Sequence, residues 1–166
     1  RHKNDISTFR DGTIRFDMVD ITMTHFKPKE IGITVQQARD LGYEVEDENE
    51  VVELKPQDVV IPMNCTEKLV NTTKYIDDLL VTLYGMERFY KCETHQDLVG
   101  HLIMGIAPHT SGAILSRIIG FADVKGHYGH PYFHAAKRRN CDGDIDAILL
   151  LLDGLLNFSR SFLSAN

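Results

Sequence analysis

The chain has 166 residues, of which 43% are hydrophobic and 25% are charged, and its formal net charge is −6. This length can bury a substantial core, and this composition is typical of a globular domain rather than a disordered segment. The acidic balance argues against a general nucleic-acid coat protein, which would normally be basic. The negative net charge is still compatible with a catalytic domain whose own acidic residues hold cations.

The chain begins at Arg1 rather than at methionine, so we expect it to be part of a longer protein. Its three cysteines, Cys65, Cys92 and Cys141, are widely spaced and form no CxxC pair. Neither a zinc module nor a disulfide framework is therefore expected, and a reducing, intracellular setting fits best. The longest apolar run, residues 147–152, is far too short to span a bilayer.

The first third of the chain is predicted to be rich in β-structure. After a turn at residues 11–12, apolar and polar residues alternate from 13 to 18, which is typical of a half-buried strand. Thr34 is expected to cap a short helix that ends at Gly42. Residues 51–63 then read as two short strands with a break between them.

The middle of the chain holds a predicted amphipathic helix at 66–84, with one apolar face and Gly85 as its stop signal. The apolar segments 98–108 and 111–124 fit either strands or helices, because their periodicity does not separate the two. A last helix is expected at 146–163, where apolar residues form a broad face.

Residues 140–144, NCDGD, are the first candidate site. Asp142 and Asp144 are two positions apart, so an extended backbone places both carboxylates on one side. Gly143 allows a tighter turn, and Asn140 adds a carbonyl oxygen on the same alternation. Three such oxygens suit a hard cation such as Mg²⁺, and two acids so close repel each other unless a cation lies between them.

A non-functional alternative, an ordinary surface turn, also remains open for this loop. Closely spaced aspartates are common in solvated or ion-paired surface turns, and the spacing alone favours that interpretation. A calcium-binding EF-hand loop is not indicated, because the glutamate it needs at its twelfth position is Leu151 when counted from Asn140.

A basic triplet, Lys137-Arg138-Arg139, directly precedes the acidic loop. Metal-assisted phosphoryl transfer needs cations that align phosphates, and arginine matches two phosphate oxygens at once. The alternative is that these cations simply pair with the neighbouring aspartates. Finding both features within eight residues shifts the balance towards catalysis.

His127, His130 and His134 are spaced by three and four, which on a helix would place them on one face. Nearby glycines and a proline argue against a helix across all three. A transition-metal site is therefore disfavoured, and structural or phosphate-contacting histidines are expected.

The segment HPYFHAAKRRNCDGDID resembles the catalytic segment of the large subunit of archaeal family D DNA polymerase. The resemblance covers nearly the whole chain, through words that occur in the same order: DGTIRFD, THFKPKEIG, ELKPQDVV, IDDLL, YGMERFY, GHLIMGIAPHTSG, RIIGFADV, HPYFHAAKRRNCDGD and LLLDGLLNFSR. It is similar, more distantly, to the largest chain of multisubunit RNA polymerases, whose pattern N-A-D-F-D-G-D has an aspartate where Asn140 stands here.

The resemblance implies an α+β fold, with a double-psi β-barrel of a two-barrel polymerase core and flanking helices. The lysine-bearing second barrel of such a core is not recognisable in this chain. On this basis we expect four parts: a β-rich part at 1–64, a helical scaffold at 65–97, a catalytic barrel segment at 98–146 and a C-terminal helix at 147–166.

The resemblance also implies a DNA-directed DNA polymerase. Asn140, Asp142 and Asp144 would hold two Mg²⁺ ions, or Mn²⁺, for transfer of a nucleotide to a primer 3′-hydroxyl. Asp146 would tune the metal or start the following helix. The residues expected to contact nucleotide or DNA are Lys137, Arg138 and Arg139, with His134, His130, His109 and Arg117 as weaker candidates.

The partners implied are template-primer DNA, deoxynucleotides, the rest of the large subunit with the second barrel, a Mre11-like small subunit carrying 3′–5′ exonuclease activity, and a sliding clamp. No membrane association and no zinc site in this segment are expected, and activity is expected only within the heteromeric complex. Two other functions remain open: a non-catalytic structural or DNA-binding module, and a metal-dependent nuclease.

Overall fold

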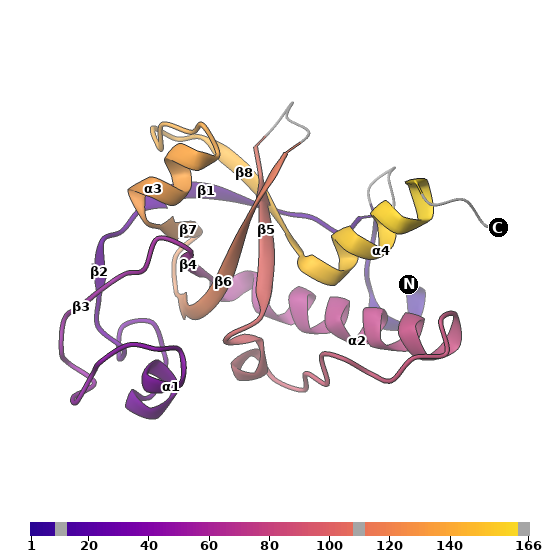
Figure 1. Cartoon of the computed structure of the whole chain (residues 1–166), viewed down its shortest axis with the longest axis horizontal. Helices are drawn as coiled ribbons and strands as arrows, with labels where there is room; N and C mark the ends of the chain where they lie inside the picture. Colours follow the sequence, from indigo (N-terminus) through magenta and orange to yellow (C-terminus); the bar gives the residue numbers. More distant parts are fainter. Residues whose placement is uncertain (9–12, 108–111, 163–166) are drawn as a thin grey trace.

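A closed barrel of six strands organises the computed structural model, which describes residues 1–8, 13–107 and 112–162, with side chains as far as 157 (Figure 1). The order around the barrel is β1–β7–β4–β6–β5–β8. The strands are β1 (Phe16–Thr22), β4 (Asp58–Pro62), β5 (Leu102–Ile106), β6 (Ala113–Ala122), β7 (Gly126–Gly129) and β8 (Ile145–Leu150).

The barrel mixes two kinds of strand pairing. The pairs β1·β7 and β4·β6 are parallel, whereas β1·β8, β4·β7, β5·β6 and β5·β8 are antiparallel. Parallel neighbours need long crossover connections, so strands that are far apart in the sequence become adjacent in space. The fold is α+β, as expected, and its closed mixed barrel is consistent with a double-psi barrel.

Helices and a small sheet surround the barrel. The long helix α2 runs beneath it in the view of Figure 1. No helix of the described chain has the length and apolar character needed to cross a membrane. The remaining elements are α1 (Val35–Asp40), α2 (Thr66–Thr82), α3 (Pro131–Ala136), α4 (Leu151–Phe162), the pair β2 (His25–Phe26) and β3 (Val52–Glu53), and short 3₁₀ turns at His2–Asn4, Met63–Cys65 and His95–Leu98.

Two apolar clusters share the strands β4 and β6. Val59 and Ile118 pack with α2 in the larger cluster, whereas Val60 and Ile119 pack with the α1 region in the smaller one. Successive strand residues face opposite sides, so β4 and the second half of β6 are buried on both faces. This explains why their sequences read as continuous apolar runs rather than as an alternating pattern.

The predicted start of α1 is confirmed. The hydroxyl of Thr34 accepts the backbone N–H of Gln37 at 3.1 Å, and the Gln37 side-chain oxygen accepts the backbone N–H of Thr34 at 3.0 Å. Together the two bonds satisfy donors that have no partner within the helix. Gly42, with a φ of 94°, lies just beyond the end of the helix, as expected.

The last helix begins later than the sequence suggests. Residues 147–150, which we expected to be helical, belong to β8, and α4 starts at Leu151. β8 pairs with β1 and β5, and its residues 148–150 are all buried, where a short apolar run suits a strand as well as a helix. The strands of the barrel therefore come from more than one of the expected parts. β1 and β4 lie within 1–64, and β8 crosses the expected boundary at 146.

A buried carboxylate fixes the loop after α2 and allows a test of the fold. Asp77 accepts the backbone N–H groups of Phe89, Tyr90 and Lys91 at 3.0, 2.9 and 2.8 Å. We predict that Asp77→Asn lowers the free energy of unfolding by about 3 kcal/mol, because the amide of asparagine turns a donor towards a buried N–H. Chemical denaturation measures this change.

The neighbouring Asp78 is the matched control. Its carboxylate is partly exposed and pairs with Arg88 at 2.8 Å. Because such surface pairs contribute little, Asp78→Asn should lower the free energy of unfolding by about 0.5 kcal/mol. Equal losses in the two variants would contradict the anchoring role of Asp77.

Candidate functional site

The loop from Lys137 to Asp144 joins α3 to β8 near β1 (Figure 1). Three of its residues have left-handed backbone angles: Arg138 with a φ of 61°, Cys141 with 58° and Gly143 with 107°. Glycine adopts this conformation freely, but each of the other two pays roughly 1 kcal/mol or more for it. Such a backbone persists only where surrounding contacts hold it.

A buried ion cluster lies beneath this loop. The Nζ of Lys137 donates to Asp20 Oδ1 at 2.9 Å and to Asp146 Oδ2 at 2.7 Å. The side chains of both aspartates are fully buried, and that of Lys137 is 1% exposed. A buried charge is tolerated only when it is paired, so the three groups stabilise one another.

Arg139 links this cluster to the acidic loop. Its Nε lies 2.7 Å from Asp146 Oδ1 and 3.6 Å from Asp144 Oδ2, and its Nη2 donates to the carbonyl of Ile145 at 3.1 Å. The Asp144 carboxylate also accepts the backbone N–H of Asn140 at 3.3 Å. Asp144 is therefore held from two sides.

Two buried histidines complete the cluster. The Nδ1 atoms of His127 and His134 lie 3.5 and 3.7 Å from Asp20 Oδ1. His134 Nε2 donates to the carbonyl of Ile21 at 3.0 Å, since a carbonyl can only accept. Burial lowers the pKa of His134 to about 4 and also lowers the pKa of His127. Both rings are therefore neutral near pH 7.

The two buried aspartates differ in their acidity. Burial alone would raise the pKa of Asp20, but the nearby His127 ring and the Lys137 ammonium hold that pKa well below its usual range. Burial raises the pKa of Asp146, and the Asp20 carboxylate adds to this rise against the opposing effect of Lys137. Asp20 is thus the firmly ionised member of the pair.

The acidic loop presents its oxygen donors outwards. Asn140 and Asp142 are exposed and Asp144 is partly buried. Within the described residues, no hydrogen bond or ion pair engages the Asp142 carboxylate. That part of the chain contains no group of three or more His, Cys, Asp or Glu side chains arranged for a metal ion. The donors available here are two carboxylates and one amide, an all-oxygen set of the kind that Mg²⁺ prefers.

The basic triplet does not act as one patch. Lys137 was expected to contact nucleotide or DNA, but its ammonium is buried between two carboxylates. Arg139 is paired with Asp146 and Asp144, as the ion-pair alternative foresaw. Arg138 alone is exposed and without a partner among the described residues.

The histidine candidates lie in different environments. His130 caps the N-terminus of α3, and its Nδ1 accepts the backbone N–H of Tyr132 at 3.1 Å. Pro131 is the first residue of this helix, a position that proline favours, while His127 lies on β7, so no helix spans all three histidines, as expected. His134 is buried rather than on the surface where we expected it, and His109 lies outside the described residues.

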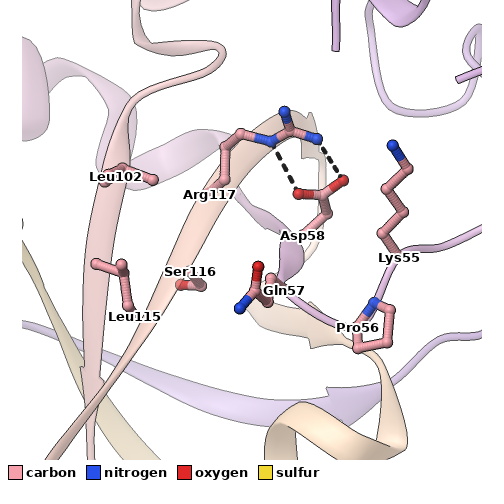
Figure 2. A pocket seen from close by; sticks show the side chains of 8 residues that line it. All are labelled: Lys55, Pro56, Gln57, Asp58, Leu102, Leu115, Ser116 and Arg117. Carbon is pink, nitrogen blue, oxygen red and sulfur yellow. Dashed lines mark hydrogen bonds and ion pairs between the residues drawn. The ribbon is translucent and has the colours of Figure 1, made fainter. Parts of the chain in front are cut away.

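Arg117 belongs to a different region of the barrel. Figure 2 shows its guanidinium facing Asp58, with Nε–Oδ1 and Nη2–Oδ2 distances of 2.9 and 2.7 Å. The pair lines a pocket of about 600 Å³. Arg117 pairs with Leu102 at the start of β5, and this end of β5 pairs with the last residues of β8. The acidic loop instead leads into the first residues of β8. The structure does not bring Arg117 to this loop.

Sequence reasoning missed Asp20. It lies on β1 in register with His127 of β7, far from the acidic loop in sequence. The available signal was its position: Phe16 and Met18 precede it on the same face of the strand, so an apolar residue would be expected there. An acid at such a position needs a buried partner, which the sequence alone does not identify.

Comparison with known proteins points to one family. Residues 1–166 match the family model described as "DNA polymerase II large subunit DP2, catalytic domain". The chain is similar to proteins named DNA polymerase II large subunit, and is 55% identical to that of Methanocorpusculum labreanum, 57% to that of Archaeoglobus fulgidus and 58% to that of Thermoplasma acidophilum, in each case over 98% of this chain. It spans about 15% of the length of these relatives.

The buried histidine His134 predicts a pH dependence of stability. Its pKa is about 4 in the folded chain against a usual 6.5, so between these values the unfolded chain binds more protons. This residue's contribution therefore falls as the pH falls from 6.5 to 4, by up to about 1.4 kcal/mol per pH unit. The raised pKa of Asp146 acts in the opposite direction.

A variant isolates the contribution of His134. Denaturation of His134→Gln across this range should show less loss of stability on acidification than the parent, by up to about 3 kcal/mol at pH 4. His25→Gln, at an exposed position on β2, should leave the parent's pH dependence unchanged. An unaltered pH profile in His134→Gln would refute the assignment.

Proposed function

Because the chain belongs to the family of catalytic domains of the DNA polymerase II large subunit, we propose that it forms part of the active site of a DNA-directed DNA polymerase. The observation that carries the proposal is the acidic loop 140–144. It presents the unpaired carboxylate of Asp142 beside the fixed carboxylate of Asp144, on a backbone held by buried ion pairs.

In this proposal Asn140, Asp142 and Asp144 hold Mg²⁺, for which Mn²⁺ could substitute. Their all-oxygen donor set fits such an ion, and the exposed position of Asp142 leaves it open to solvent and substrate. The bound metal would supply the charge that activates a primer 3′-hydroxyl and stabilises a leaving pyrophosphate. The protein's own task is to keep two like charges close together and correctly oriented.

The basic residues take separate roles. Lys137 and Arg139 are engaged by carboxylates, so we assign them to support of the loop rather than to phosphate contacts. Arg138 is exposed at the start of the loop and is the residue we assign to a phosphate of the nucleotide or of the template-primer. Contacts to phosphates position nucleic acid without reading its sequence, as a replicative enzyme requires. We leave Arg117 out of the site, since it pairs with Asp58.

The rest of the enzyme lies outside this chain, which covers about 15% of its relatives' length. We propose that activity requires the remainder of the large subunit, with a second barrel that supplies lysines, and a small subunit that carries the 3′–5′ exonuclease. Template-primer DNA and deoxynucleotides would be the substrates, a sliding clamp would be a further partner, and the cytoplasm would be the site of action.

The first test of this function is primer extension by the complete enzyme in Mg²⁺. Asp142→Asn and Asp144→Asn should each lower kcat by about 10³-fold, because a lost metal ligand removes several kcal/mol of transition-state stabilisation. DNA affinity and exonuclease activity should persist. Asp123→Asn, at an exposed turn between β6 and β7, is the matched control and should extend normally.

The outcomes of this test separate the competing functions. Normal extension by both loop variants would leave the loop as an ion-paired turn of a structural module. Loss of nucleotide release together with unchanged incorporation would instead indicate a metal-dependent nuclease.

The second test concerns Arg138. Arg138→Ala should weaken DNA or nucleotide binding and, if the contact is to the DNA backbone, lower the slope of log affinity against log salt by about one. Fluorescence anisotropy at several salt concentrations measures both quantities. Lys125→Ala, at another exposed cation, should leave them unchanged. Unaltered affinity for both ligands in Arg138→Ala would contradict this role.

A further inference from the structure

The loop from Lys137 to Asp144 is joined at both ends to one residue of β1. The Asp20 carboxylate accepts a hydrogen bond from the ammonium of Lys137, at the start of the loop, at 2.9 Å. The Asp20 backbone N–H donates to the carbonyl of Asp144, which ends the loop, at 3.0 Å. Asp20 is thus joined to the entry and the exit of the segment 138–143, although it lies 117 positions before Lys137.

Packed neighbours restrict the contact between Asp20 and Lys137. The Lys137 ammonium lies 4.9 Å from the centre of the Phe133 ring. The lysine stem passes over Gly105 of β5, where an added Cβ would lie 3.1 Å from both Lys137 Cδ and Phe133 Cζ. Neither Lys137 nor Asp20 can therefore shift without disturbing packed neighbours or leaving a buried charge unpaired.

The constraint extends to the proposed metal ligands. Asp146 Oδ2 accepts a hydrogen bond from Lys137, and its Oδ1 lies 2.7 Å from Arg139 Nε in an ion pair. The same Nε lies 3.6 Å from Asp144 Oδ2. A continuous chain of charged groups therefore runs from Asp20 to Asp144. The strained backbone at Arg138 and Cys141 lies between the two fixed ends.

We propose that Asp20 is a positioning residue, which through Lys137 and its own amide fixes the acidic loop so that Asp142 and Asp144 are presented to a divalent cation. The inference rests on the proposed function of the loop and goes beyond it, because it assigns a role to a buried residue of another strand that touches neither substrate nor metal. Outer contacts of this kind typically change metal affinity by 10- to 100-fold.

The test compares Asp20→Asn with a matched variant, Asp58→Asn, in the complete enzyme. Asp58 is also a buried strand aspartate held by a cation, at 2.7 Å from Arg117, but it lies outside the loop (Figure 2). Binding of Mn²⁺ alone, without DNA or nucleotide, is measured by electron paramagnetic resonance. The site is defined as the bound Mn²⁺ that disappears in Asp142→Asn.

We expect Asp20→Asn to weaken this Mn²⁺ site by about tenfold or more, and Asp58→Asn to change it by less than about twofold. In extension assays kcat should fall with Asp20→Asn while KM for the primer-template stays constant. In metal-free buffer, hydrogen exchange of the segment 138–144 should accelerate in Asp20→Asn only. If Asp20→Asn matches Asp58→Asn in Mn²⁺ affinity and exchange, the proposal is overturned.

A double variant separates positioning from simple stability, and decides the matter if Asp20→Asn folds poorly. Asp20→Asn with Lys137→Met removes one buried negative and one buried positive charge, leaving Asp146 paired with Arg139. Replacing a buried ion pair in this way often restores stability. We expect the thermal stability to recover while Mn²⁺ affinity remains at least about tenfold reduced. Recovery of both would overturn the proposal.

The two proposals can fail separately. If Asp142→Asn binds Mn²⁺ as the parent does, the loop is no metal site, and both the proposed function and the positioning role fail. If Asp142→Asn loses the ion and Asp20→Asn behaves like Asp58→Asn, the metal site stands and only the role of Asp20 is refuted.

Discussion

The buried ammonium of Lys137, held between the carboxylates of Asp20 and Asp146, is the contact on which the rest of the site depends. Removing one partner from such a group leaves an uncompensated charge in a low-dielectric interior, at a cost of several kcal/mol. The three residues therefore cannot move independently. They belong to β1, to the end of α3 and to β8. Their pairing therefore fixes the loop 137–144, which connects α3 to β8.

The mixed barrel makes this contact possible. β1 pairs in parallel with β7 and antiparallel with β8, so Asp20 faces His127 in register on one side, while Met18 faces Asp146 on the other. The neutral histidines fill the space around Asp20 without adding charge. The result is a buried cluster of paired charges beneath a loop whose outer face stays acidic. Ion pairing, one of the two explanations of the sequence, thus occupies the inner face of the loop, and the outer face is the one to which we assign the proposed metal.

Much of the local structure could be predicted from the sequence, because it depends on short-range rules. The capping box at Thr34, the strands on either side of Lys55 and the long helix α2 follow from side chains a few residues apart. The segments left undecided, now β5 and β6, are apolar at successive positions even where burial alternates along the strand, so neither a period of two nor one of 3.6 distinguishes them. The same limit explains the misplaced start of α4.

The candidate loop, the chemical type of its oxygen donors and, through the resemblance, the polymerase family could all be read from the amino-acid sequence. Which charges remain available depends on the folded structure. Lys137, Arg138 and Arg139 are adjacent in sequence, yet one is buried, one is exposed and one is ion-paired. The difference arises from Asp20 and Asp146, which the crossing strands bring to Lys137 from distant positions, and long-range pairing of this kind leaves no periodic trace in the sequence.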